Sequence, residues 1–432
     1  MKRKCLISTL LILVMLCTGC ASKDNKETVG NGSTPEKVEN NVELSFWNIV
    51  DDPNNAMSLR FEESIKQVEE ELGITIKYEA INGQTYHTKL KVALAGNQLP
   101  DIFIVHPGNA RDPFITAEAV SSLNDTLDNT EIGKKFYEGY LQADEEGDIY
   151  SVPFRADMAE VMFYNKKIFN EVGIDVPKNW EEFKNAVIAI REKGYAPIGL
   201  GNKDRWMGDL LYNTMVLRED PKAFEKAIKG EIDFTDKAFL DGAKKVQELV
   251  KLDAFQKGYM GAIEPEVVEM FESDKIAMYF IGTWAFDDLI GRLGDNLGYA
   301  PFPAIGADSQ ASESICGTRN VKPWGFMVSS KSKHVDLAKE ALLKFVDINN
   351  ELTVKQGGIP YMETSVLSEK EINPEFAKYI EDIKNVKFIQ TYWADFLPKD
   401  KGEPYRDLNQ KLFSGDLDPQ KYVEEQQKII SE

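Results

Sequence analysis

The sequence has few residues of the kinds that build metal centres or activated nucleophiles. Its three histidines, His87, His106 and His334, are scattered, and none is paired with another at the spacing of metal ligands. No glycine-rich phosphate loop follows the first expected strand, and the chain contains no Gly-x-Ser-x-Gly motif. We therefore expect a protein that is not an enzyme and that uses no metal and no cofactor.

Positive charge is also in short supply, because 51 Lys and Arg stand against 71 Asp and Glu, a net charge of −20. Such a surface repels phosphate backbones, so we expect no nucleic-acid partner. The acidic balance favours solubility and identifies no partner by itself. Two of the many carboxylates could still stand at the separation that glycoside hydrolysis needs, which a sequence cannot show. A surface glycoside hydrolase therefore stays an alternative.

A long apolar run is missing as well. The apolar stretch at 6–16 follows the cationic Lys2-Arg3-Lys4 and is too short for a membrane-spanning helix, which needs about 20 residues. It ends in Leu-Cys-Thr-Gly-Cys at 16–20, which resembles a bacterial lipobox, although Cys17 stands where that motif usually has leucine. These features predict a signal peptide at 1–19 and a lipidated Cys20. The residues after Cys20, up to 41, are almost free of apolar side chains and predict a flexible tether. The alternative is an ordinary secretory signal with a chance cysteine.

Cysteine is too scarce for a disulfide framework. The four are Cys5, Cys17, Cys20 and Cys316, and cleavage before Cys20 removes the first two. Lipidation of Cys20 then leaves Cys316 without a partner. The fold must therefore be stabilised by its own apolar core, and 432 residues that are 43% hydrophobic can build two domains of ordinary size.

The hydrophobic pattern after residue 41 alternates between strands and helices. The expected strands are at 42–46, 74–78, 101–105, 197–200, 275–280 and 325–328. The expected helices are at 61–72, 86–95, 180–190, 237–252 and 337–346. This alternation predicts an α/β fold in which helices cover both faces of a parallel sheet. Ligands of such sheets bind beyond the carboxyl ends of the strands.

Tryptophan placement is the most informative feature that is present. Trp180 belongs to the apolar face of an expected helix and is predicted to be a core residue. The other five tryptophans lie in or beside expected loops: Trp47, Trp206, Trp284, Trp324 and Trp393. A sugar ring has an apolar face that suits flat aromatic rings and hydroxyls that suit Asp, Asn and Arg side chains. For any one of these residues the alternative is a lid on the core.

Arg155 follows the apolar Val152-Pro153-Phe154, where an unpaired arginine is costly to bury. It either pairs with a nearby acid such as Asp157 or donates hydrogen bonds to a ligand.

Several segments, taken in order, resemble one known family. They are Leu44-Ser45-Phe46-Trp47, residues 91–96 with 99–103, residues 150–154 with 163–169, 173–174 and 177–183, residues 275–278 with 282–284, and residues 357–360. In this order and spacing the chain resembles the extracellular solute-binding proteins of bacterial ATP-driven sugar importers, the group that contains maltose-binding protein.

The resemblance implies a two-lobed periplasmic-binding-protein-like α/β fold, in which each lobe is a sheet flanked by helices and the chain crosses the hinge more than once. One lobe is expected from 42–152 plus 302–355, and the other from 153–301 plus 356–432. By motif, Trp284 is similar to the family's stacking aromatic, and Trp47, Asp51 and Asp52 match the loop after the first strand. The remaining residues expected to face the ligand are His106, Arg155, Trp206, Trp324, Trp393 and Asp395.

The resemblance also implies what the chain does. We expect a monomeric lipoprotein on the extracellular face of a bacterial cell membrane, which captures a carbohydrate such as an oligosaccharide and delivers it to ABC permease subunits. A binding protein for a non-sugar solute such as a polyamine is the main alternative. It would need a denser cluster of acids around aromatic rings than the loops show.

Overall fold

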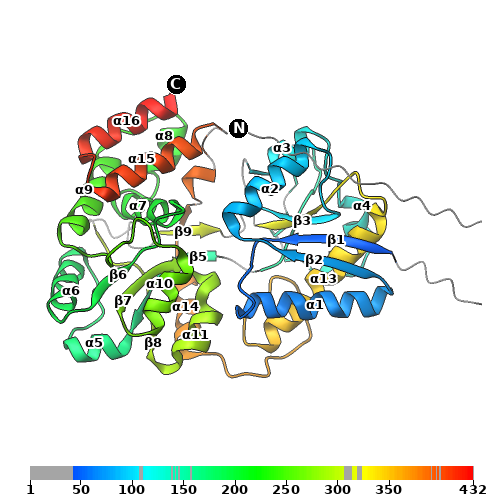
Figure 1. The fold of residues 1–432 in the computed structure, drawn as a ribbon, viewed down its shortest axis with the longest axis horizontal. Helices are drawn as coiled ribbons and strands as arrows, with labels where there is room; N and C mark the ends of the chain where they lie inside the picture. The colour runs from blue at the N-terminus through cyan, green and yellow to red at the C-terminus, as the bar shows by residue number, and fades with distance from the viewer. Residues whose placement is uncertain are drawn as a thin grey trace, which may run out of the picture. The chain divides into compact units, whose positions relative to one another are not determined.

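The computed structural model describes residues 42–106, 110–137, 140–141, 143–144, 146–155, 158–305, 314–318, 324–390, 392–395, 397 and 400–431 (Figure 1). The predicted signal peptide, Cys20 and the tether lie outside these residues. Within them, no helix is long and apolar enough to cross a membrane.

The first sheet contains β2 (Thr75–Ala80), β1 (Glu43–Asn48), β3 (Ile102–Val105), β10 (Gly325–Val328) and β4 (Val152–Pro153), in that order. The strand β1 is parallel to β2 and β3, as the alternating pattern predicted. The expectation of a wholly parallel sheet is wrong for β10, which is antiparallel to both β3 and β4. The chain reaches β10 from the second sheet, so no helical crossover on this sheet forces it to be parallel.

Helices cover both faces of this sheet. Figure 1 shows α1 (Ala56–Leu72) and α13 (Val335–Lys355) on one face and α2 (Gly83–Ala95) on the other. The helix expected at 61–72 is confirmed as α1, which ends at Gly73 with a left-handed φ of 63°. The core on the α1 side includes aromatic rings from three elements, with the ring of Phe345 4.9 Å from Phe46 and 5.2 Å from Phe61. Short helices complete this part: α3 (Asp112–Thr116), α4 (Asn124–Asp128) and η2 (Gly133–Lys135).

The second sheet runs in the order β11 (Phe388–Gln390), β9 (Ser314–Thr318), β5 (Met158–Asn165), β7 (Ile276–Gly282) and β6 (Ala196–Gly199). The strand β8 (Leu297–Ala300) also pairs with β5. The predicted strands at 197–200 and 275–280 are confirmed as β6 and β7, which are parallel to each other. The expected parallel arrangement is wrong for β5, which is antiparallel to β7, β8 and β9. The central strand β5 was missed. Its residues Val161, Met162 and Phe163 are all fully buried, so it lacks the alternation that marks a half-exposed strand.

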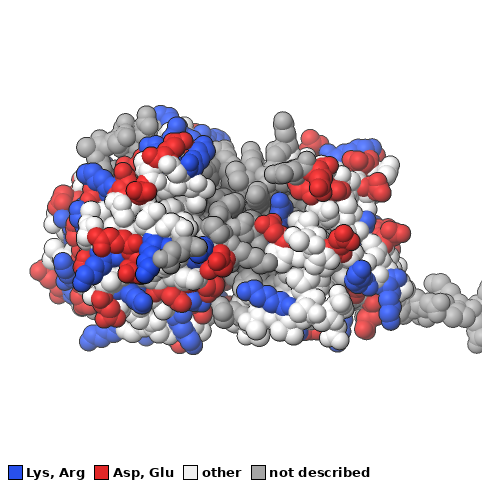
Figure 2. Space-filling model, turned by 90° about the horizontal axis from the view of Figure 1, so that it is seen from above, with Lys and Arg blue, Asp and Glu red and all other residues white. Residues whose placement is uncertain are grey.

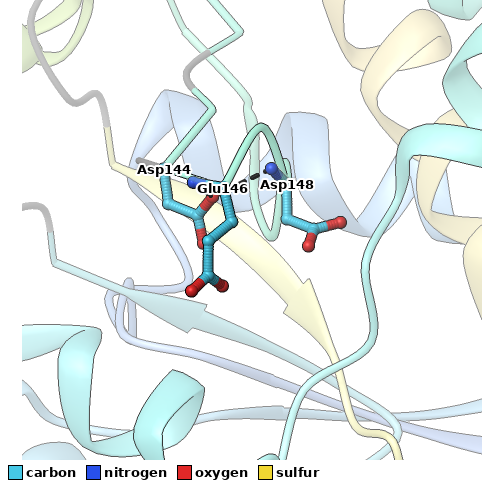
Figure 3. A group of neighbouring side chains, drawn as sticks. All are labelled: Asp144, Glu146 and Asp148. Atoms are coloured by element: carbon cyan, nitrogen blue, oxygen red, sulfur yellow. Dashed lines mark hydrogen bonds between the residues drawn. The ribbon is translucent and has the colours of Figure 1, made fainter.

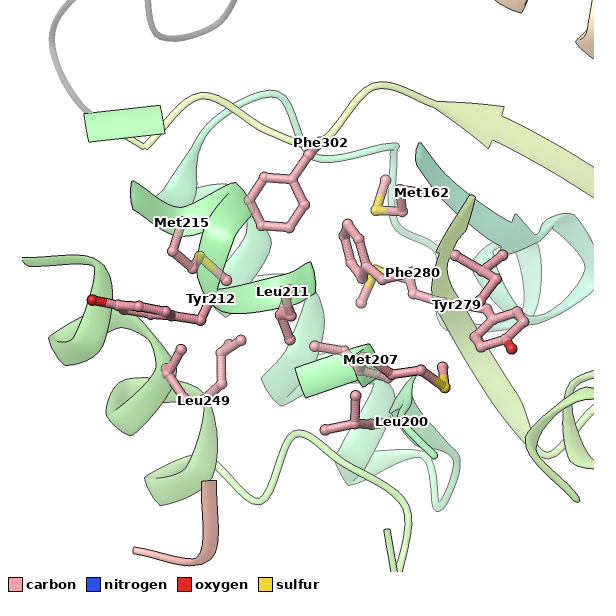
Figure 4. Close-up of a cluster of buried hydrophobic side chains, with 14 of the residues drawn as sticks. Met162, Leu200, Met207, Leu211, Tyr212, Met215, Leu249, Tyr279, Phe280 and Phe302 are labelled. Atoms are coloured by element: carbon pink, nitrogen blue, oxygen red, sulfur yellow. The ribbon is translucent and has the colours of Figure 1, made fainter. Parts of the chain in front are cut away.

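The second sheet has the larger helical cover. Its helices are α5 (Lys166–Val172), α6 (Trp180–Glu192), α7 (Trp206–Glu219), α8 (Ala223–Ile228), α9 (Lys237–Lys251), α10 (Glu264–Glu272), α11 (Phe286–Leu293), α14 (Pro374–Lys384), α15 (Gly402–Ser414) and α16 (Pro419–Ser431), with short turns η3 (Thr283–Ala285), η4 (Gly294–Asn296) and η5 (Trp393–Asp395). Figure 4 shows Leu211 of α7, Leu249 of α9, Phe280 of β7 and Phe302 converging in one apolar cluster. Trp180 is 3% exposed, which confirms it as a core residue.

The chain passes between the two sheets repeatedly. It leaves the first sheet after β4, enters the second at β5, and returns between β9 and β10. It leaves the first core again after Met362, since Phe376 of α14 already packs in the second core. The predicted fold class, two sheets flanked by helices with repeated crossings, is confirmed. The exact lobe bounds stay a prediction, because β9 joins the second sheet while Tyr361 and Met362 pack with the first core.

Substitution Asn179→Ala tests the helix start that the sequence identified. The Asn179 side chain accepts a hydrogen bond from the Glu182 amide at 3.0 Å and caps α6. We expect its loss to lower the free energy of unfolding by about 1 kcal/mol, measured by urea denaturation with circular dichroism. Asn179→Ser keeps a capping oxygen and should restore most of that stability. Equal stability of the alanine and serine variants would contradict this role.

Candidate ligand-binding site

Five of the residues expected to face a ligand form one continuous chain of contacts. Trp206 begins α7 and its ring lies 6.0 Å from that of Trp284, which follows β7. The guanidinium of Arg155 lies 6.0 Å from the Trp284 ring and 5.0 Å from that of Trp324. The Trp324 ring in turn lies 3.5 Å from that of His106. Trp324 and His106 flank strands of the first sheet, and Trp206 and Trp284 belong to the second, so the contacts join the two.

The position of Trp284 depends on the two residues before it. A Cβ atom at Gly282 would overlap the Trp284 ring, so only glycine lets the indole lie against the backbone there. Thr283 accepts a hydrogen bond from the Ala159 amide at 3.2 Å, which fixes the turn to β5. The Gly-Thr-Trp spacing thus has a physical reason, namely that it places an aromatic face at the end of β7.

A buried carboxylate contacts Trp284, and other acids act on it. Glu264, the first residue of α10, accepts a hydrogen bond from the Trp284 side chain. Burial raises the pKa of Glu264 to about 7; the bond from Trp284 opposes this, while the charges of Asp288, Asp204 and Asp51 add to it. The sequence analysis missed Glu264, because an acid in the first turn of a helix is ordinary helix chemistry and gives no signal of a site.

Asp52 forms an ion pair with an arginine of α11, a helix beside the second sheet. Arg292 of α11 contacts Asp52 at 3.3 Å, and it also contacts Asp288 at 2.8 Å and Glu272 at 2.5 Å. A second ion pair lies nearby, because Arg60 of α1 contacts Asp287 of α11 at 2.9 Å. Asp52 therefore links the loop after β1 to α11, while the exposed Asp51 adds its charge near Glu264.

The histidine end of the site is uncharged near neutral pH. The rings of His87 and His106 lie 4.6 Å apart. Burial lowers the pKa of His87 to about 4, and the neighbouring charges of Arg406 and Lys91 lower it further. Burial, followed by His87 and nearby arginines, holds the pKa of His106 well below its ordinary value. Both rings are therefore neutral imidazoles, whose two nitrogens can donate and accept hydrogen bonds.

The other expected site residues lie elsewhere. The half-buried Trp47 has the Lys89 ammonium 3.9 Å above its ring and packs beside α2. The structure places Trp393 in the core instead of at the site, because it is 1% exposed and stacks on Phe224 at 4.9 Å. The backbone of Asp395 belongs to η5, and its side chain lies outside what the structure describes. Asp157, the acid that was considered as an ion-pair partner of Arg155, is also outside the described residues.

One group of acids could hold a cation by spacing alone. Asp144, Glu146 and Asp148 extend from one turn, with ligand atoms within 4.8 Å of one another (Figure 3). The Asp144 carboxylate accepts backbone hydrogen bonds from Glu146 and Asp148, both at 2.9 Å. These bonds account for the turn, and we assign no metal to it.

The face in Figure 2 carries acidic and basic side chains interspersed, as expected for a soluble surface.

Two sheets with helical cover, joined by one cluster of aromatic and charged side chains, define a two-domain α/β ligand-binding protein. The chain belongs to the family of bacterial extracellular solute-binding proteins, whose model matches residues 58–347. It is 25% identical over 386 residues to an uncharacterized ABC transporter extracellular-binding protein of Pyrococcus horikoshii, covering 83% of this chain and 81% of that protein.

Solved structures are similar over most of the chain. A chitin oligosaccharide binding protein is 28% identical, with a TM-score of 0.79 over 90% of this chain and 98% of that one. A structure described with xylan utilization by the thermophilic bacterium Caldanaerobius polysaccharolyticus is 27% identical, with a TM-score of 0.82 over 90% of this chain and 99% of that one. The resemblance that the sequence motifs indicated is therefore confirmed.

Substitution Gly282→Ala should displace the Trp284 ring, because the new methyl group and the indole cannot occupy the same space. Overpacking of this kind typically costs about 1–3 kcal/mol of unfolding free energy. Near-ultraviolet circular dichroism should report the altered indole environment, and urea denaturation the lost stability. Gly291→Ala is the matched control, since a Cβ atom there meets nothing within 4 Å. Unchanged spectra and stability in Gly282→Ala would contradict the packing of the Trp284 ring against the backbone of Gly282.

Substitution Glu264→Gln should change how stability depends on pH. The folded protein holds the Glu264 proton more tightly than the unfolded chain, because the pKa rises from 4.5 to about 7 on folding. The free energy of unfolding therefore falls as pH rises through this window, and the loss is complete above it. The glutamine variant lacks this titration, so its profile between about pH 4.5 and 7 should be flatter and its stability at pH 8 higher than wild type.

The measurement is chemical denaturation at a series of pH values. Glu269→Gln, an exposed position on the same helix, serves as the control. The burial of Glu264 would be contradicted if both variants followed the wild-type profile.

Proposed function

We propose that the chain is the carbohydrate-binding protein of an ABC importer and that it holds an oligosaccharide at the contact chain from Trp206 to His106. The observation that carries this is the pair Trp206–Trp284, with carboxylates at its edge and Arg155 beside it. Aromatic faces pack against the C–H face of a pyranose, while carboxylates accept its hydroxyl protons and arginine donates to its oxygens. Relatives named for chitin oligosaccharides and for xylan utilization support this ligand class.

Ligand binding would stabilise the arrangement in which the two sheets share the site. A sugar that contacts Trp284 on one side and Trp324 on the other favours the form that brings these residues together. The ion pairs Arg60–Asp287 and Asp52–Arg292 connect the elements of the first sheet to α11 and stabilise the same arrangement. No bond is broken in this cycle, so the site needs no catalytic group.

Delivery and anchoring complete the proposal. The family relative from Pyrococcus horikoshii is named as an ABC transporter extracellular-binding protein, which supports docking of the loaded form on permease subunits. Lipidation of Cys20, with residues up to 41 as a tether, would hold a monomer at the extracellular face of the membrane.

A polyamine is the second candidate ligand. The carboxylates of Glu264, Asp288, Asp204 and Asp51 near Trp284 form a denser acidic group than the sequence alone indicated. Acids beside aromatic rings suit ammonium groups. Against this, Arg155 occupies the same contact chain and would repel a long polycation. A thermal-shift screen with mono- and oligosaccharides beside spermidine and putrescine separates the two, since a true ligand raises the melting temperature by mass action.

Substitution Trp284→Ala should weaken oligosaccharide binding at least tenfold, because it removes an aromatic face from the centre of the site. A tenfold change is about 1.4 kcal/mol, which is less than the usual effect of truncating a buried aromatic contact. Isothermal titration calorimetry with the best saccharide from the screen measures it. Trp180→Phe, a core substitution away from the contact chain, should lower stability and leave affinity unchanged. Wild-type affinity in Trp284→Ala would remove this residue from the site.

A further inference from the structure

Three nitrogen atoms at one end of the contact chain are shielded from solvent and have no hydrogen-bond partner among the described residues. They are Nε of Arg155, Nε1 of Trp324 and Nε2 of His106. The three side chains are neighbours, because Arg155 and His106 both lie against the Trp324 ring, at 5.0 and 3.5 Å. A buried polar atom without a partner destabilises the folded state, and native proteins leave few of them. Three in mutual contact point to a bound group that supplies their partners.

The chemistry of these atoms restricts that group. An indole N–H and an arginine Nε–H can only donate, and a neutral imidazole can donate from Nε2 as well. The bound group must therefore offer several acceptor oxygens close together. Both the carboxylate of an acidic sugar and the hydroxyls of a neutral one contain such oxygens, so the charge of the surroundings has to decide between them.

The charge favours an anion. Arg155 is cationic, and no carboxylate of the described residues forms an ion pair with it. Burial lowers its pKa, and the Tyr392 side chain opposes that shift. The rings of Phe154 and Trp324 lie 5.0 Å from its guanidinium, so they cover it without neutralising it. Arg406, which is paired with Glu403 at 3.1 Å, also acts on His106 as a positive charge. The acids Asp288, Asp204 and Asp51 instead act on Glu264, which is bonded to the Trp284 side chain.

We propose that the Arg155–Trp324–His106 end of the site binds the carboxylate of a uronic acid residue within the oligosaccharide. This inference rests on the proposed function and deepens it from a carbohydrate to an acidic one. Arginine meets a carboxylate with two parallel hydrogen bonds, and burial strengthens such charge-assisted contacts. The acids around Trp284 repel the same carboxylate, so the sugar enters in one orientation, with its neutral rings on Trp206 and Trp284.

The test compares neutral and acidic oligosaccharides with the full chain. The neutral probes are xylotriose, maltotriose, chitotriose and raffinose, and the acidic probes are glucuronic-acid-substituted xylotriose and trigalacturonate. Thermal shift ranks them and isothermal titration calorimetry measures the affinities. We expect the tightest probe to carry a carboxylate. We also expect Arg155→Gln to weaken it at least tenfold while changing the affinity of the best neutral probe several-fold less.

Companion variants keep the result interpretable. Trp324→Phe keeps an aromatic ring but removes the five-membered half of the indole with its N–H donor, so it should reduce acidic-probe affinity more than neutral-probe affinity. Arg191→Gln removes the same charge from an arginine that binds backbone oxygens of Asp253 and Phe255, and it should change neither affinity. Arg155→Lys keeps the charge without the planar fork and should fall between wild type and Arg155→Gln.

The two proposals fail in different ways. A neutral probe that binds as tightly as any acidic one, or an equal loss for both in Arg155→Gln, overturns the uronate assignment and leaves carbohydrate binding standing. Absence of binding by every saccharide overturns the proposed function and the uronate assignment together.

Discussion

The guanidinium of Arg155 is in contact with aromatic rings from elements of both sheets. It lies between Trp284, which follows a strand of the second sheet, and Trp324, which precedes a strand of the first. Arg155 itself stands on the passage from β4 to β5, where the chain leaves one sheet for the other. A cation in this position makes the site depend on both sheets at once. The side chains on each side are arranged relative to it, with acids around Trp284 and neutral imidazoles beyond Trp324.

Ion pairs away from the aromatic rings also connect the two sheets with their helices. Arg60 is nearly buried and contacts both Asp287 and Gln356, each at 2.9 Å. Solvent screens a half-buried ion pair of this kind less than a surface pair. Removing one partner leaves the other charge buried and uncompensated. Arg292 connects Asp52 to Asp288, whose charge in turn influences Glu264 beside Trp284. A change in the packing of one sheet against the other therefore changes the electrostatic potential at Glu264 and Trp284.

The local sequence predicted six of the strands and five of the helices of the described residues, and five of the residues that it expected at the site lie in contact. The elements and residues that it missed have physical causes. Helices such as α1 and α6 carry their own caps and apolar stripes, so they could be read without knowing the fold. Trp206, Trp284 and Trp324 were recognisable because their neighbours are loop residues. Trp393 has polar neighbours too, yet Tyr212 and Phe224 from distant segments enclose it, and no local pattern reports that. Glu264 was hidden for the opposite reason, because its helix position explains an acid without any ligand.

The burial of Trp180 and Trp393 has an optical consequence. These two indoles are 3% and 1% exposed and lie within the second core, whereas Trp206, Trp284 and Trp324 are only partly buried along the contact chain. The chain therefore contains two kinds of fluorescent tryptophan. The surroundings of the buried ones stay constant, and the solvation of the others changes when a solute binds. Intrinsic fluorescence of the unlabelled protein should contain a steady blue-shifted component and a responsive red one. Occupancy could then be followed as a ratio of the two, independent of protein concentration.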